Sequence, residues 1–147
     1  MMRLPPDFKE FLRLLNSRRA EYLLIGGYAV GFHGYPRATG DMDIWVAANP
    51  PNAALVAQAL LDFGFSAKDV SPSLFTEPGR IVRIGVPPMR LEIVTGISGV
   101  DFAACYARRV TAIIDGVSVS VIGLKDLRVN KKASGRHKDL DDLEHLP

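Results

Sequence analysis

The 147-residue sequence is short of cysteine. Cys105 is the single example, so no disulfide can form within the chain, which fits a reducing compartment. The three histidines, His33, His137 and His145, stand at no cysteine–histidine spacing that is typical of a zinc site. We therefore expect no zinc centre, and we expect Cys105 to pack in the core rather than to act as a nucleophile.

Long apolar runs are missing as well. No segment approaches the roughly 20 consecutive apolar residues that a membrane-spanning helix needs. Residues 3–10 mix basic, acidic and proline residues and lack the apolar core of a signal peptide. These absences predict a cytoplasmic protein that does not associate with a membrane.

The sequence also lacks a large excess of charge of one sign. Its net charge is +2, whereas a nucleic-acid-binding domain usually carries a dense basic patch. Basic residues nevertheless gather near the C-terminus, at Arg128, Lys131, Lys132, Arg136 and Lys138. This cluster is suited to gripping RNA or a triphosphate, but a solvated helix face explains it at least as well.

What the sequence does contain fits one globular domain over residues 1–147. Apolar residues make up 48% and charged residues 23%, which is ordinary for a folded domain. A chain of this length buries roughly 68–70% of its unfolded surface, so it can build a core without disulfides or metals. No repeat, low-complexity tract or linker interrupts the sequence.

Hydrophobic periodicity and turn residues predict alternating helices and hairpins. Helices are expected at residues 8–15, 28–33, 50–63, 98–106, 125–133 and 138–146. Strands are expected at residues 22–25, 42–46, 81–84, 90–94, 110–114 and 117–121. The helix at 98–106 should begin at Ser98, which has capping-box spacing to Asp101. This order predicts a mixed α/β (α+β) fold rather than a doubly wound or an all-β one.

The acidic pair Asp41 and Asp43 carries the first chemical signal. Residues two apart on a strand point to the same face, about 6.6–7 Å apart along the backbone. Two carboxylates about 4 Å apart repel by roughly 4 kcal/mol at an effective dielectric near 20, so the pair calls for a cation. Oxygen ligands favour magnesium, and two ions would suit an in-line phosphoryl displacement. Taken alone, however, Asp-x-Asp is more often the solvated start of a strand.

The glycine pair Gly26–Gly27 carries the second signal. It follows an apolar strand and precedes a predicted helix, where backbone N–H groups can hold a phosphate. A lone Gly-Gly is usually just a tight turn. The combination with the two aspartates is much more specific than either motif.

Together these residues resemble the signature of the nucleotidyltransferase superfamily, which shares its core with the polymerase-β palm. The resemblance is to a bacterial group with Gly-Gly, not Gly-Ser, ahead of the Asp-x-Asp pair. It covers nearly the whole chain beyond the first helix, through Gly26-Gly27-x-Ala29, His33-Gly34, Arg37-x-Thr39-x-Asp41-x-Asp43, Glu92, Ser98-Gly99-Val100, Asn130-Lys131, Arg136-x-Lys138-Asp139 and Asp142. The implied fold is a mixed central β-sheet flanked by helices, with a C-terminal helix pair.

The resemblance implies a magnesium-dependent transfer of a nucleoside monophosphate from an NTP to a hydroxyl. The implied catalytic and metal-binding residues are Asp41, Asp43 and Glu92, which would hold two Mg²⁺ ions. The implied nucleotide-binding residues are Gly26, Gly27, Arg37, Thr39 and Lys131. Glu92 stands where the family usually has aspartate, and it could instead pair with Arg83 or Arg90 on a solvated face. Ordinary surface cations are an equally good interpretation of Arg37 and Lys131.

The family context implies a toxin–antitoxin or abortive-infection system, with tRNA or a partner protein as the acceptor. The residues themselves do not choose between these acceptors. A catalytically silent nucleotide- or RNA-binding module on the same fold is the alternative that Glu92 favours. A regulatory partner that acts only through protein contacts is a third hypothesis. Trp45 lies on the same strand face as Asp43, but it fits the core better than a position stacked on a base.

Overall fold

A computed structural model describes residues 2–147. The elements, in chain order, are α1 (Pro6–Ser17), β1 (Tyr22–Ile25), α2 (Gly26–Phe32), β2 (Asp41–Val46), α3 (Pro50–Phe63), the 3₁₀ helix η1 (Pro72–Phe75), β3 (Ile81–Val86), β4 (Met89–Val94), α4 (Phe102–Ala107), β5 (Val110–Ile114), β6 (Val117–Val121), α5 (Leu124–Ser134) and α6 (His137–His145).

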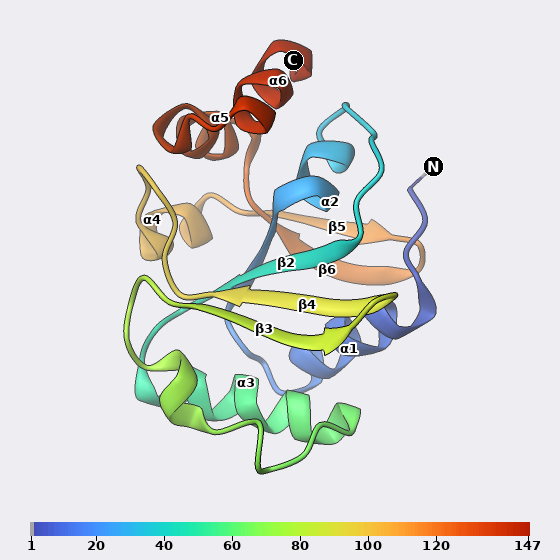
Figure 1. Ribbon diagram of the computed structural model, residues 1–147, viewed down its shortest axis with the longest axis vertical. Coiled ribbons are helices and arrows are strands. Elements are labelled where there is room, and N and C mark those ends of the chain that lie inside the picture. The colour runs from blue at the N-terminus through green and yellow to red at the C-terminus, as the bar shows by residue number, and fades with distance from the viewer. Residues whose placement is uncertain (1) are drawn as a thin grey trace.

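The strands form one mixed sheet in the order β3-β4-β2-β1-β6-β5. Both predicted hairpins, β3–β4 and β5–β6, are antiparallel pairs, as is β1–β2. The pairs β2–β4 and β1–β6 are parallel. Figure 1 shows α1 and α3 toward one side of the sheet, and α2 and the C-terminal pair α5–α6 toward the other. The predicted mixed α/β architecture is confirmed.

The core lies mainly between the sheet and the pair α1–α3. Apolar residues of α1 at three- and four-residue spacing are buried: Phe8, Phe11, Leu12 and Leu15. All four residues of β1 are buried as well, because this strand lies inside the sheet. Asn49 caps α3 by accepting a hydrogen bond from the Asn52 N–H, and Gly64 ends the helix at φ +121°. The helix therefore has the bounds that its sequence predicts.

Apart from α3, the helices begin one to four residues away from their predicted starts, and two of these differences change the interpretation of a residue. Helix α2 begins at Gly26 rather than at Tyr28, so the glycine pair forms its first turn instead of preceding it. Helix α4 begins after Asp101, whose side chain accepts a hydrogen bond from the Ala104 N–H at 3.1 Å. Asp101, and not Ser98, is thus the N-cap, because an aspartate one position before the apolar run satisfies the free backbone donor directly.

Two predicted core residues are confirmed. The Trp45 side chain is 1% exposed and meets the ring of Phe102 edge-on, with centroids 5.1 Å apart. Cys105 is fully buried. Burial, followed by the nearby Asp126 carboxylate, raises the pKa of the Cys105 thiol to about 11, so the thiolate is disfavoured at neutral pH.

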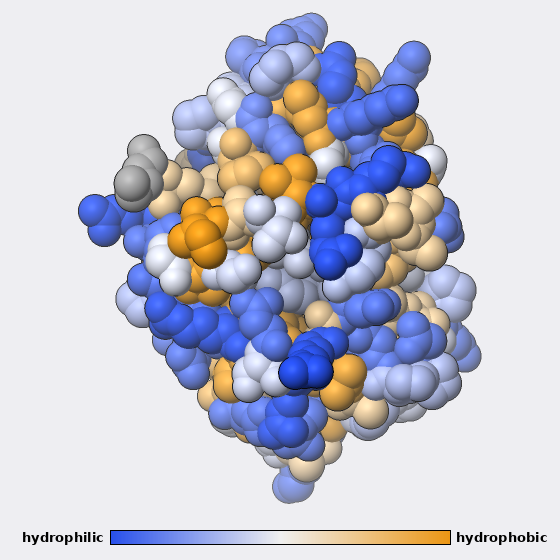
Figure 2. Space-filling model, turned by 180° about the vertical axis from the view of Figure 1, so that it is seen from behind, coloured by the Kyte–Doolittle hydropathy of each residue, from blue (hydrophilic) through white to orange (hydrophobic). Residues whose placement is uncertain are grey.

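The sheet exposes apolar side chains at its two edge strands. Ile81 and Val86 on β3 and Ile113 on β5 are more than half exposed. On the face turned away in Figure 1, apolar residues gather in small groups between polar ones (Figure 2). Among the helices of residues 2–147, none has the length and apolar character needed to cross a membrane.

Candidate active site

Strand register places the three predicted catalytic carboxylates on one face of the sheet. Asp43 on β2 lies opposite Glu92 on β4, and Asp41 lies two residues before Asp43. Their chain neighbours Met42 and Leu91 are fully buried on the opposite face. The alternation of a β-strand therefore directs Asp41, Asp43 and Glu92 to the same side, as the sequence predicts.

Two of these carboxylates are paired with arginines from neighbouring strand positions. Arg90 contacts Asp41 with Nη2–Oδ2 and Nε–Oδ2 distances of 3.1 and 3.2 Å. Arg83 contacts Glu92 with an Nε–Oε2 distance of 3.3 Å. The pairing of Glu92 with Arg83, left open by the sequence, is thus present. Within residues 2–147, the Asp43 carboxylate has no ion-pair partner within 4.0 Å.

The surroundings of Asp43 raise the pKa of its carboxyl group. Burial, followed by the negative charge of Glu92, raises the pKa of the Asp43 carboxyl from 3.8 to about 6. The positive charges of Lys138 and Lys131 act in the opposite direction and only partly offset this. A half-buried carboxylate facing a second acid is a position that a divalent cation would stabilise.

Gly26 and Gly27 have no side chains, so other side chains of the site can lie directly against their backbone. Gly26 has φ +65°, and a Cβ at this position would overlap the Asp43 carboxylate. A Cβ at Gly27 would lie 2.7 Å from the Thr39 hydroxyl oxygen. Glycine is therefore required here for close approach of two side chains of the chain itself. Phosphate binding by Gly26, Gly27 and Thr39 stays a prediction.

Arg37 and Lys131 belong to a buried ionic network. Lys131 Nζ lies 3.1 Å from both Asp139 Oδ1 and Asp142 Oδ2, and its side chain is 4% exposed. Arg37 binds Asp142 through two hydrogen bonds of 2.8 and 2.9 Å. The interpretation of Lys131 as a surface cation is therefore wrong. Sequence patterns missed this network, because the two aspartates also suit an exposed first turn and helix face.

The network joins three segments that are far apart in sequence. Lys131 is on α5, Asp139 and Asp142 are on α6, and Arg37 is in the loop that leads into β2. Burial alone would raise the pKa values of both aspartates, but hydrogen bonds from the arginines and from Lys131 outweigh it and lower them. The ionised network thus fixes the C-terminal helix pair over the start of β2.

The carboxylates lie at the floor of two adjoining cavities of about 280 and 420 Å³, which we call the acidic cleft. Both cavities are lined by Asp43, Glu92 and Arg136. The remaining predicted site residues that line one of them are Gly26, Lys131, Arg37, Thr39 and Asp41. Gly27 lines a neighbouring cavity instead.

Basic side chains form the rim of the acidic cleft. Arg83, Arg136 and Lys138 line it and are exposed. Arg136 also binds Asp139, with an Nε–Oδ2 distance of 2.8 Å, so this carboxylate orients it at the rim. Arg83 was recognised from the sequence only as a partner of Glu92. Its place beside the cleft depends on the β3–β4 register, which pairs Arg83 with Glu92.

The donor chemistry of the cleft fits magnesium. Asp41, Asp43 and Glu92 offer only oxygen ligands, and Asp43 faces a like charge that a cation would neutralise. Among residues 2–147, no three acidic, histidine or cysteine side chains converge closely enough to hold a metal together. Asp41 and Glu92 are instead each paired with an arginine. A metal would therefore compete with Arg90 for Asp41 and with Arg83 for Glu92.

Comparison with solved structures identifies the fold of the chain. No protein-family model and no curated protein matches the sequence. Among solved structures, a proposed nucleotidyltransferase from Thermotoga maritima aligns with a TM-score of 0.63 and 15% identity, over 97% of this chain and 93% of that one. The chain has the nucleotidyltransferase fold.

A second similar structure is an antigenic nucleotidyltransferase-like protein from Paracoccidioides brasiliensis. It aligns with a TM-score of 0.54 and 20% identity, over 93% of this chain and 72% of that one. Similarity at this identity shows the shared fold, and activity has to be argued from the site. Membership in the bacterial Gly-Gly group and a toxin–antitoxin role stay predictions.

Proposed function

We propose that the protein is a magnesium-dependent nucleotidyltransferase that moves a nucleoside monophosphate from an NTP to a hydroxyl of RNA or of a protein. The observation that carries this proposal is the register that sets Asp43 opposite Glu92, with Asp41 beside it, on the floor of a cleft rimmed by Arg83, Arg136 and Lys138. An acidic floor suits a divalent cation, and a basic rim suits the triphosphate bound to it.

Each part of the chain has a distinct task in this mechanism. Asp41, Asp43 and Glu92 would hold magnesium, which neutralises the triphosphate and lowers the pKa of the attacking hydroxyl. Arg136 and Lys138 would contact the phosphate oxygens on which negative charge accumulates as pyrophosphate leaves. Arg37 and Lys131 would position these groups by fixing α5 and α6, since their charges are already paired with Asp142.

The direct test is transfer of α-phosphate label from each of the four NTPs, with magnesium, into macromolecules of a bacterial lysate. The wild type is compared with Asp43→Asn and with Asp62→Asn, a surface aspartate of α3 that pairs with Arg18. We expect label in RNA or protein with the wild type and Asp62→Asn, and none with Asp43→Asn. Digestion with ribonuclease or protease then shows whether the acceptor is RNA or protein. Label that ribonuclease releases from tRNA would support a tRNA-directed toxin.

A catalytically silent nucleotide- or RNA-binding module is the second candidate. The ion pairs Arg83–Glu92 and Arg90–Asp41 favour it, because they neutralise two of the three acids without a metal. It predicts that Mg-NTP raises the melting temperature while no label is transferred. A regulatory role through protein contacts alone predicts neither, because only a ligand of the folded state raises its stability.

A further inference from the structure

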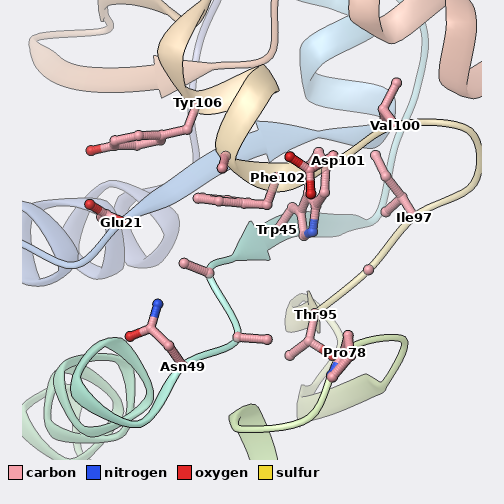
Figure 3. Close-up of a pocket in the computed structure, with 14 residues that line it drawn as sticks. Glu21, Trp45, Asn49, Pro78, Thr95, Ile97, Val100, Asp101, Phe102 and Tyr106 are labelled. Atoms are coloured by element: carbon pink, nitrogen blue, oxygen red, sulfur yellow. The ribbon is translucent and has the colours of Figure 1, made fainter.

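A separate cavity, of about 530 Å³, lies beneath α4 and beside the acidic cleft (Figure 3). Gly96 and Ile97, which follow β4, line both the cleft and this cavity. The two spaces are therefore separated by a single short segment of chain. A molecule seated in the cavity would have one end close to the reacting centre proposed above.

Aromatic rings form one wall of the cavity. The rings of Phe102 and Tyr106 stack with centroids 5.4 Å apart and an interplanar angle of 18°. Trp45 meets Phe102 edge-on at 5.1 Å, which fixes the orientation of the Phe102 ring. In Figure 3 the space lies between these rings and Asn49, with Glu21 toward one end and Ile97 toward the other. Such a wall favours a flat ligand that can stack on it.

The charge of the cavity is opposite to that of the cleft rim. Among residues 2–147, its charged lining residues are the exposed carboxylates Glu21 and Asp101, and no lysine or arginine lines it. Beside the lining, the Arg109 guanidinium already stacks on the Tyr106 ring, 4.0 Å from its centroid, and one Asp101 oxygen caps α4. Two carboxylates beside aromatic faces attract a planar cation, through ion pairing and through the ring electrons. The same carboxylates repel a polyphosphate. The basic rim of the cleft therefore favours an anionic nucleotide, and the cavity favours a cationic ligand.

We propose that the cavity binds the acceptor substrate through a planar cationic group, such as a guanidinium or amidinium, which favours a protein acceptor, through an arginine, over the RNA acceptor. Only the assignment to the acceptor rests on the proposed transferase function, because the binding chemistry follows from the lining residues alone. The rim of the cleft takes the anionic donor, and the cavity takes the cationic acceptor on the other side of Gly96–Ile97. This division keeps the two substrates from occupying each other's sites.

The test uses three probes with one ring and different charge: benzamidine, benzamide and benzoate. Trp45 is the only tryptophan of the chain, so quenching of its fluorescence reports occupation of the cavity directly. We expect affinity to fall in the order benzamidine, benzamide, benzoate. Each of these exposed carboxylates should contribute up to about fivefold to the preference for benzamidine over benzamide.

Matched variants separate charge from shape. Glu21→Gln and Asp101→Asn keep side-chain size, and asparagine at position 101 can still cap α4. The double variant should bind benzamide as the wild type does but lose the preference for benzamidine. Equal binding of the three probes by the wild type, no quenching by any probe, or a preference that survives in the double variant would overturn the cavity's cation selectivity.

A second measurement tests the assignment to the acceptor. Saturating benzamidine should leave the affinity for Mg-ATP unchanged and should inhibit label transfer without changing the KM for the NTP. Competition between benzamidine and Mg-ATP would overturn the separation of the two sites. If no NTP is ever transferred while the benzamidine preference holds, the planar-cation site stands and the acceptor assignment fails with the transferase proposal.

Discussion

Asp43 and Glu92 face each other across the parallel strands β2 and β4, and no cation of the chain is paired with Asp43 within residues 2–147. Like charges opposite each other on neighbouring strands destabilise a sheet. The fold therefore keeps an unfavourable pair at the floor of its cleft. Such an arrangement is expected where a site's chemistry, rather than stability, determines the residues.

The first prediction concerns pH. Because the pKa of Asp43 is raised to about 6 in the folded protein, the folded state binds a proton more tightly than the unfolded state. This favourable contribution is complete below about pH 4, is lost as the pH rises to about 6, and stays absent above it. Asp43→Asn should therefore be more stable than the wild type at pH 7 by on the order of 1–2 kcal/mol, and the gap should close at pH 4.

Urea unfolding of both proteins at pH 4 and pH 7, without metal, measures this gap. Asp41→Asn is the control, because it breaks the ion pair with Arg90 instead of removing an unpaired charge and should not stabilise the protein. Addition of Mg²⁺ should reverse the order at pH 7, since metal stabilises only the wild type. If Asp43→Asn is less stable than the wild type at pH 7 without metal, the ionised Asp43 carboxylate does not destabilise the folded protein.

The second prediction concerns Gly26. Gly26→Ala forces a left-handed backbone conformation on alanine, which costs about 1–2 kcal/mol, and pushes its methyl group into the Asp43 carboxylate. We expect a loss of unfolding free energy and a weaker affinity for Mn²⁺. Gly116→Ala is the matched control, since Gly116 has a similar left-handed backbone at φ +83°, lies outside the acidic cleft, and a Cβ there meets nothing within 4 Å. Unchanged Mn²⁺ binding by a folded Gly26→Ala variant would show that Gly26 does not position Asp43.

The sequence predicted most of this fold because its signals are local. The apolar run of β1, the Asn49 cap and Gly64 stop of α3, and the Asp115–Gly116 turn each depend on a few neighbouring residues. Strand alternation predicted in the same way that the side chains of Asp41 and Asp43 point to one face of the sheet. The start of α2 at Gly26 was missed because a glycine pair at a strand end is typical of a turn as well as of a first helical turn.

Long-range pairing is what the sequence could not supply. The partner of Arg37 lies 105 residues away on α6. For Glu92 the sequence offered Arg83 and Arg90 without choosing, and the β3–β4 register decides for Arg83. Local patterns also could not tell that Lys131 is buried, because its neighbours on α5 include the exposed Lys132. Charged residues on a short amphipathic helix look alike until the packing of α6 is known.

The third prediction tests the ionic network. Lys131→Met keeps an unbranched side chain but leaves Asp139 and Asp142 with less positive charge around them, both almost fully buried. Loss of one partner of a buried ion pair typically costs about 3–5 kcal/mol, so the variant should unfold at much lower urea. Lys132→Met, at the exposed neighbouring position, should cost little. Equal stability of the two variants would show that the network does not hold the helix pair.

The fourth prediction concerns the arginines that compete with a metal for the acids. Arg83 binds Glu92 and also lines the cleft, so it should act on the metal and on the nucleotide in opposite directions. Arg83→Gln frees Glu92 and should raise the affinity for Mn²⁺ alone by up to about fivefold, as expected for one partly exposed ion pair. The same change removes a cation from the rim and should weaken binding of the magnesium complex of a non-hydrolysable NTP.

Calorimetric titration with Mn²⁺, and then with the nucleotide complex, separates the two effects. Arg80→Gln is the matched control, because Arg80 pairs with Glu77 outside the cleft and its loss should change neither affinity. A fall in Mn²⁺ affinity in Arg83→Gln would mean that Arg83 supports the metal site instead of competing for it. A rise in both affinities would mean that Arg83 only blocks the cleft. Opposite changes are expected only if one arginine leaves the carboxylate when metal binds and then contacts the triphosphate.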